Sequence, residues 1–234
     1  MCGRLNLTDA PGVIQLMGDL GFDTQYLVPR DYENGYNLAP TDRVLVGCQV
    51  AGRPVLRPMT WWLTPFWAPE VSRQYAMFNA RGETVATSPA FRDAFRATRC
   101  IVPASSFIEW QQRQGVKTPL LITPPTPFCF FAGIWASWRK DPSLESFAIL
   151  TAASEGDFSH IHSRAPVSLM PEQFEAWLKA STPIEQLLKF IAPKPLSGWQ
   201  ATPVSPRINA SRIKDPACLE PTGEAEILDE TDVQ

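Results

Sequence analysis

Short apolar runs of strand length, separated by proline-rich loops, constrain the fold of this chain most strongly. Four runs stand out, and they cover residues 43–49, 54–59, 128–135 and 146–151. The first two flank the turn-like pair Ala51-Gly52 and predict a β-hairpin. Many of the 23 prolines gather between periodic segments, as in residues 123–127, where they predict rigid loops rather than a low-complexity linker. We therefore expect a mostly antiparallel sheet.

Helical patterns are fewer than strand patterns. A helix is predicted from Asp9 to Leu20, because Gly21 tolerates the left-handed backbone of a C-terminal cap. Further helical patterns cover residues 90–97 and 171–180. A last helix is predicted after residues 182–185, Thr-Pro-Ile-Glu, which match an N-cap, a proline at the first helical position and a capping-box glutamate.

The composition is that of a globular chain with a sizeable core, since 44% of the 234 residues are hydrophobic and 19% are charged. No window approaches about 18 uninterrupted apolar residues, and no basic segment precedes an apolar run at the N-terminus. We therefore expect no membrane partner and a cytoplasmic location, at the nucleoid in a bacterium. The five cysteines are scattered and form no CxxC pair, which argues against a disulfide framework and a metal site.

The acidic residues are concentrated at the C-terminus. Residues 220–234 hold six acids and no base, although the net charge of the whole chain is only −3. We therefore predict a single domain over residues 1–219 and an acidic, disordered tail over residues 220–234. The remaining chain is mildly basic, which permits nucleic-acid binding through a local patch but does not require it.

Cysteine stands at the second position, so removal of the initiator methionine would leave an α-amine and a thiol on Cys2. An aldehyde forms an imine with such an amine, and the thiol then adds to the imine carbon to close a thiazolidine ring. The unperturbed pKa values, about 7.7 to 8.0 for the amine and about 8.5 for the thiol, leave a useful fraction of nucleophile at neutral pH. The alternative is that Cys2 is a small buried apolar residue.

Two polar groups lie between apolar flanks. In an extended segment Asn79 and Arg81 would project from one face, where they could hold a phosphate or satisfy loop carbonyls. Glu109 follows Phe107-Ile108, and partial burial there would raise its pKa and allow proton exchange with an amine near neutral pH. The alternative for Glu109 is an ion pair with a nearby arginine.

Both histidines of the chain lie in one short segment, as His160 and His162. Because no third histidine and no acid pair is nearby, a metal site is weakly supported, and one acid/base histidine beside Arg164 fits better. Tryptophans also cluster at positions 61, 62 and 67. Most of them are expected in the core, but an exposed one could stack on an unpaired base, contributing about 1 to 3 kcal/mol per base.

In order and spacing, these segments resemble the SRAP family, the SOS-response-associated peptidase-like proteins that shield abasic sites in single-stranded DNA. The resemblance covers residues 1 to about 220. It rests on eight segments, which are residues 1–4, 36–41, 62–68, 79–84, 99–110, 132–135, 161–166 and 204–209. Together with the strand-rich middle of the chain, it implies one α+β domain, with a distorted, mainly antiparallel β-sheet or barrel core and peripheral helices.

The resemblance also implies catalytic roles for four residues. Cys2 would capture the ring-opened aldehyde of an abasic deoxyribose, forming a thiazolidine crosslink. Glu109 would assist imine formation and its reversal, and His162 would assist sugar ring opening. Asn79 would orient Cys2 and the lesion.

The expected partner is single-stranded DNA with an abasic site, alone or at a junction with duplex, and no cofactor or metal is implied. Phosphate contacts are expected from three arginines, and the other DNA contacts from Asn37, Thr151 and two stacking or wedging residues. The arginines are Arg4, Arg81 and Arg164, and the stacking residues are Pro40 and Trp67. The chain departs from the family pattern at residues 61–62, 105–108 and 165, where no bond-making group is lost.

Three functional hypotheses follow. The first is a DNA-protein crosslinking enzyme, with a lyase-type activity as an extension. The second is a thiol peptidase that uses Cys2 as nucleophile with His162 and Glu109. The third is a noncovalent single-stranded DNA-binding module, for which Cys2 would be dispensable. A monomer is expected in each case.

Overall fold

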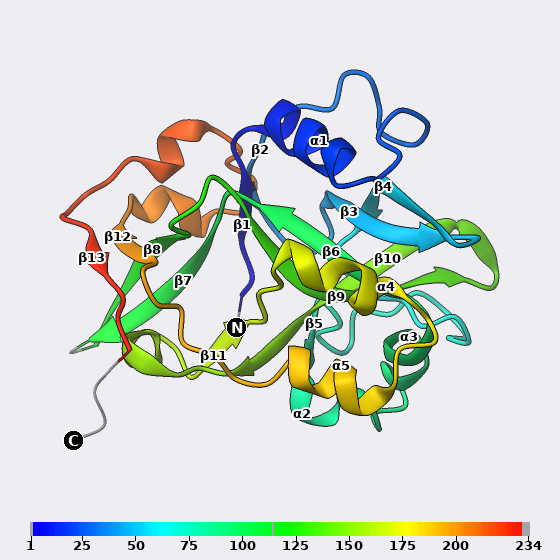
Figure 1. Ribbon diagram of the computed structural model, residues 1–234. Coiled ribbons are helices and arrows are strands. Elements are labelled where there is room, and N and C mark those ends of the chain that lie inside the picture. The colour runs from blue at the N-terminus through cyan, green and yellow to red at the C-terminus, as the bar shows by residue number, and fades with distance from the viewer. Residues whose placement is uncertain (1, 114, 231–234) are drawn as a thin grey trace.

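The computed structural model describes residues 2–113 and 115–230, which form two β-sheets with short helices around them (Figure 1). The first sheet has the strand order β13-β12-β8-β7-β1-β2. Its strands are β1 (Leu5–Leu7), β2 (Gly35–Leu38), β7 (Ser106–Arg113), β8 (Val116–Thr123), β12 (Gln200–Pro203) and β13 (Glu226–Ile227). All its pairings are antiparallel.

The second sheet has the order β11-β10-β4-β3-β6-β9, and β9 pairs again with β10, so that β10, β4, β3, β6 and β9 close into a barrel. Its strands are β3 (Arg43–Val50), β4 (Arg53–Thr60), β6 (Arg99–Ala104), β9 (Cys129–Trp138), β10 (Asp141–Ala153) and β11 (Arg164–Pro166), with β5 (Asn79–Arg81) beside β10. Among the strand pairs that the structure describes in this sheet, β10 is parallel to β4 and to β5, and the others are antiparallel. The predicted α+β class, with a mainly antiparallel core, is confirmed.

The predicted hairpin is present as β3 and β4, which pair from Arg43 with Thr60 to Val50 with Arg53. Ala51 and Gly52 form its turn with φ angles of 50° and 78°. Two residues at positive φ give a turn whose twist matches that of the flanking strands. The sequence pattern therefore located both the strands and the turn.

The helices lie outside the sheets (Figure 1). They are α1 (Ala10–Asp19), α2 (Gly82–Val85), α3 (Arg92–Ala97), α4 (Phe174–Leu178) and α5 (Ile184–Phe190). Asp9 caps α1 by accepting a hydrogen bond from the Gly12 amide at 2.9 Å, and Gly21 follows it at φ 88°. The capping box predicted for α5 is wrong, because the Thr182 hydroxyl instead donates to the Ala176 carbonyl at 2.6 Å.

Part of the C-terminal segment packs onto the domain. Strand β13 pairs with β12, Pro221 bridges to Val204, and Leu228 is buried with its amide donating to the Trp199 carbonyl at 2.7 Å. The expectation of a disordered tail is therefore corrected for residues 221–229, while residues 231–234 lie outside the described part. Among the described residues, no helix is long and apolar enough to span a membrane.

The N-terminal strand runs between two neighbours and directs the start of the chain inward. Leu5 pairs with Leu38 of β2 and with Phe107 of β7, and the Ile108 amide donates to the Arg4 carbonyl at 3.1 Å. These contacts fix residues 2–4 beside β7. The same residues also meet β5 of the second sheet, through a hydrogen bond from Asn79 to Cys2.

Candidate functional site

Cys2 is fully buried where the two sheets meet. The side-chain amide of Asn79 donates to the Cys2 carbonyl at 2.7 Å, and the Cys2 thiol lies 3.9 Å from the Arg4 carbonyl. Asn79 is itself buried and held in β5, where it pairs with Ile149 of β10. The orienting role expected for Asn79 therefore has a geometric basis in a direct hydrogen bond to Cys2.

Glu109 lies on β7 with 3% of its surface exposed, as its apolar neighbours predict. Its Oε1 accepts a hydrogen bond from the Trp110 amide at 3.1 Å. Burial raises the pKa of the Cys2 thiol strongly, and the negative charge of Glu109 raises it further. The Cys2 thiol is therefore protonated at neutral pH, and the Glu109 carboxylate lies close enough to contribute to this effect.

His162 lies just after a short 3-10 turn at Gly156–His160. Its Nδ1 lies 2.9 Å from the Arg164 backbone nitrogen and 3.2 Å from the Arg164 carbonyl. Because a backbone nitrogen can only donate, the shorter contact makes Nδ1 an acceptor. In the neutral tautomer that this contact fits, Nε2 carries the hydrogen and can donate a hydrogen bond.

Strand β7 brings this turn close to Glu109. The side-chain amide of Gln111 donates to the His160 carbonyl at 3.2 Å, and Gln111 is two residues beyond Glu109 on the same strand. Side chains two residues apart on a strand share a face. Glu109 and the turn that precedes His162 therefore lie on one side of β7, whereas His160 itself is exposed.

Arg164 is bonded within the protein. Its guanidinium forms a two-point ion pair with Glu83, and its Nη2 also donates to the Thr151 carbonyl at 2.5 Å and to the Thr151 hydroxyl at 3.2 Å. The hydrogen bonds from Arg164 lower the pKa of Glu83. Thr151 is fully buried. Arg164 and Thr151, which are both expected to contact DNA, therefore belong to one hydrogen-bonded network with Glu83. Glu83 was not among the residues predicted from the sequence.

Arg4 belongs to a small cationic group on Trp110. The Arg4 guanidinium lies 5.7 Å from the Trp110 ring centre, and the Lys117 ammonium lies 5.5 Å from it. The Trp110 indole donates to Asn209 at 2.7 Å. Lys117 is therefore a second basic residue beside the N-terminal segment, and it was missed because it lies outside the motifs that mark the site.

The remaining expected DNA contacts differ in exposure. Asn37 is fully buried at φ 50°, and its amide donates to the Ala210 carbonyl at 3.1 Å and the Ile213 carbonyl at 2.9 Å. This placement gives Asn37 a structural role, and a DNA contact by its side chain has no geometric support. The other three residues face solvent to different extents. Arg81 is exposed, Trp67 is 48% exposed, and Pro40 is half-buried.

The site thus joins Cys2 and Asn79, places Glu109 close to Cys2, and puts the turn before His162 on the Glu109 side of β7. In the part of the chain that the structure describes, no group of three or more histidine, cysteine or acidic side chains could hold a metal ion. What the arrangement offers is a buried cysteine at the second position, with a hydrogen-bonding amide beside it and the Glu109 carboxyl group close by.

Comparison with known families gives one clear match. The model of the family described as SOS response associated peptidase (SRAP) matches residues 1–211. Similar proteins include the abasic site processing protein YoqW of Bacillus subtilis, which is 30% identical over 94% of this chain and 99% of its own. The abasic site processing protein YedK of Escherichia coli is also 30% identical, over 76% of this chain and 80% of its own.

Solved structures share the fold. A protein from Bacteroides thetaiotaomicron superposes with a TM-score of 0.81, over 94% of this chain and 99% of its own, at 23% identity. A phage-related protein from Bordetella bronchiseptica superposes with a TM-score of 0.60 at 26% identity, over 81% of this chain and 87% of its own.

Proposed function

The chain belongs to the SOS response associated peptidase family, and on this basis we propose that it captures abasic sites in single-stranded DNA covalently through Cys2 after Met1 is removed. The observation that carries the proposal is the hydrogen bond from Asn79 to the Cys2 carbonyl, within a site that also holds Glu109. Relatives named abasic site processing proteins support the DNA substrate.

The first step is attack by the amine of Cys2 on the aldehyde carbon of the ring-opened sugar. As the sugar opens, the anomeric hydroxyl gives up its proton and the ring oxygen gains one, and His162 would assist this transfer at Nε2. The amine attacks through its lone pair, so its ammonium form must first lose a proton, which Glu109 would accept. After attack a nitrogen proton passes to the former aldehyde oxygen and gives a carbinolamine. The carbinolamine then loses its hydroxyl as water, with a proton supplied by Glu109 to the leaving oxygen and the remaining nitrogen proton returned to Glu109, so that a neutral imine remains.

The second step closes the ring. The thiol of Cys2 adds its sulfur to the imine carbon, and its proton passes to the imine nitrogen. Because burial and Glu109 raise the pKa of this thiol, it is a poor nucleophile until the imine holds the carbon beside it. This order, amine first and thiol second, releases one water in total and leaves a thiazolidine between protein and DNA.

The same environment weighs against the peptidase hypothesis. A thiol peptidase needs a thiolate, which is obtained where neighbouring charges lower the thiol pKa. At Cys2, burial and the charge of Glu109 raise the thiol pKa, and they outweigh the N-terminal amine charge and the Arg4 carbonyl contact, which lower it. A purely noncovalent DNA-binding module would also have no use for Glu109, because a buried carboxylate beside the binding site repels phosphate.

The test is intact mass spectrometry of the protein mixed with single-stranded DNA that carries one abasic site. Wild type should give a heat-stable adduct at the summed mass less one water, and undamaged DNA should give none. Cys2→Ser keeps the amine but closes the ring poorly, so its adduct should be lost on heating while noncovalent binding remains. Absence of any adduct from wild type lacking Met1 would overturn the proposal.

A further inference from the structure

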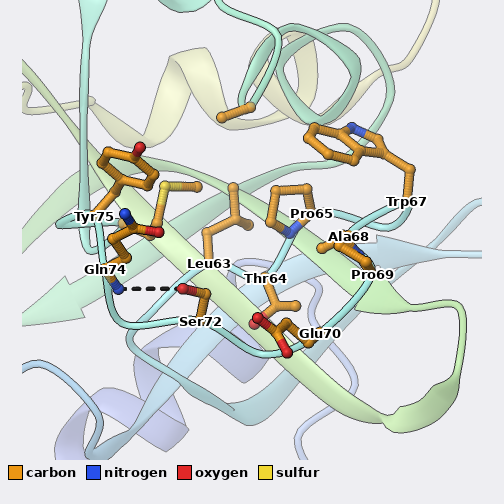
Figure 2. A pocket seen from close by; sticks show the side chains of 12 residues that line it. Leu63, Thr64, Pro65, Trp67, Ala68, Pro69, Glu70, Ser72, Gln74 and Tyr75 are labelled. Atoms are coloured by element: carbon orange, nitrogen blue, oxygen red, sulfur yellow. Dashed lines mark hydrogen bonds between the residues drawn. The ribbon is translucent and has the colours of Figure 1, made fainter.

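A hollow of about 290 Å³ lies in the loop between β4 and β5, outside the site described above. It is lined by Leu63, Thr64, Pro65, Trp67, Ala68, Pro69, Glu70, Ser72, Gln74, Tyr75, Met77 and Ala90. Figure 2 shows Trp67 and Tyr75 on opposite sides of the hollow, with Leu63 and Pro65 between them. Its volume is near the lower end of the range of about 300 to 1,000 Å³ for small-molecule sites, which suits one flat ring system.

The two aromatic walls of the hollow are partly exposed to solvent. Tyr75 is 69% exposed and Trp67 is 48% exposed, while Trp61 nearby is fully buried. Large aromatic side chains stabilise a fold by burial, so two that face solvent across an apolar hollow are suited to holding a ligand between them. The lining offers mostly apolar surface, which favours stacking over recognition of particular hydrogen-bonding groups.

The hollow is connected to the Cys2 site by a short piece of chain. Met77 lines the hollow, and its carbonyl accepts from the Leu63 amide at 3.0 Å, whereas Asn79 two residues later bonds to Cys2. Two residues of extended chain span at most about 7 Å. A DNA strand advances about 3.4 Å per nucleotide in B-form. The hollow is therefore within reach of a nucleotide that lies close in the strand to one held at Cys2.

Basic residues stand around the same loop. The Lys140 ammonium donates to the Pro69 carbonyl at 2.6 Å, and the Arg139 amide donates to the Phe66 carbonyl at 3.2 Å. Arg73 in the loop is exposed, and Glu70 is an acid in the lining. Lys140 and Arg73 are basic groups that could contact a backbone phosphate at the rim if its base entered the hollow.

We propose that this hollow takes one unpaired nucleobase next to the abasic site, stacked between Trp67 and Tyr75. The inference rests on the proposed function, and it assigns to Tyr75 a role in DNA binding. Because the walls are apolar, all four bases should be accepted, and the contribution should come from ring stacking. Holding the neighbouring base out of its stack would fix the position of the lesion beside Cys2.

The experiment measures binding of single-stranded DNA that carries a tetrahydrofuran residue, which has no aldehyde and forms no crosslink. Two kinds of DNA are compared. In one, a normal base lies on each side of the tetrahydrofuran, and in the other, the base on one side or the other is replaced by a second tetrahydrofuran. Tyr75→Ala should weaken binding about fivefold or more when the base is present, in keeping with about 1 kcal/mol or more per stacked base. It should have no effect when that base is missing. Tyr75→Phe should bind as wild type does.

Val71→Ala is the matched control, because Val71 lies in the same loop and is also 48% exposed but does not line the hollow. It should leave the affinity unchanged. An equal loss for Tyr75→Ala with and without the neighbouring base would overturn the inference. So would unchanged DNA affinity, the outcome expected if the hollow takes an apolar side chain of a protein partner.

Crosslinking to a natural abasic site is measured in parallel, which separates the two proposals. If wild type forms the crosslink but Tyr75 shows no coupling to a neighbouring base, only the nucleobase inference fails. If no crosslink forms while the coupling is present, the covalent function fails and the nucleobase site stands.

Discussion

Asn79 donates to the Cys2 carbonyl at 2.7 Å, so a residue of β5 holds Cys2 across the boundary between two sheets. Asn79→Ala removes the donor and should slow crosslinking about tenfold or more, because a misplaced reacting group loses much of its rate advantage. Asn79→Asp retains the shape but cannot donate, and should be equally slow. Single-turnover crosslinking on denaturing gels measures this, and a rate near wild type for both variants would contradict the orienting role.

Glu109 is the group that we expect to move protons at the Cys2 amine. Glu109→Gln conserves size in a buried position and removes the base, so the crosslinking rate should fall about a hundredfold or more. The wild-type rate should rise with pH as the amine, with an ordinary pKa of about 8, loses its proton. A pH-rate profile of both proteins tests this. Glu175→Gln, at an exposed position of α4, is the control and should behave as wild type does.

Much of the site around Cys2 could be predicted from the local sequence, because Cys2, Asn79 and Glu109 each lie in a short motif. The hairpin at Ala51-Gly52 and the cap at Gly21 were also predictable, since each depends on a few adjacent residues. By contrast, the β7 and β8 hairpin was not anticipated as strands, because polar residues such as Gln111 and Gln112 mask its alternation. The Glu83 partner of Arg164 joins residues 81 apart, and no local pattern reveals such a pair.

Asn37 shows the limit of transferring roles by motif, because its side chain holds the carbonyls of Ala210 and Ile213 rather than facing solvent. Asn37→Gly should lower the free energy of unfolding by about 1 to 3 kcal/mol, since buried carbonyls lose their partner. Asn37→Ala should cost more, because alanine is strained at a φ of 50°. Denaturant unfolding measures both. Full stability with weakened DNA binding would instead support the DNA contact.

Two buried cysteines face each other on β3 and β6, where Cys48 pairs with Cys100. Burial raises the pKa of Cys48 to about 12 and raises that of Cys100 well above its ordinary value. In the unfolded chain both thiols ionise from about pH 8.5. Their contribution to stability is therefore complete below that pH. It is lost as pH rises, with each thiol lowering the free energy of unfolding by about 1.4 kcal/mol per pH unit.

Urea unfolding between pH 8 and pH 11 tests this pH dependence on the wild-type protein and on Cys48→Ala. The variant should start less stable, because it leaves a small cavity, but its stability should fall less steeply with pH. Equal slopes would contradict the assignment.

Glu83 forms an ion pair with Arg164, whose guanidinium is expected to contact a DNA phosphate. Glu83→Gln should release the guanidinium and remove a negative charge, so DNA binding should tighten a few-fold. The slope of the logarithm of the binding constant against the logarithm of salt concentration should become steeper by about one. The free energy of unfolding should change by less than about 1 kcal/mol, because Glu83 is half exposed and such pairs contribute little. Titrations at several salt concentrations measure the slope. An unchanged slope would mean that Arg164 stays bound to the Thr151 carbonyl and hydroxyl and serves to position β11 against β10 rather than to hold DNA.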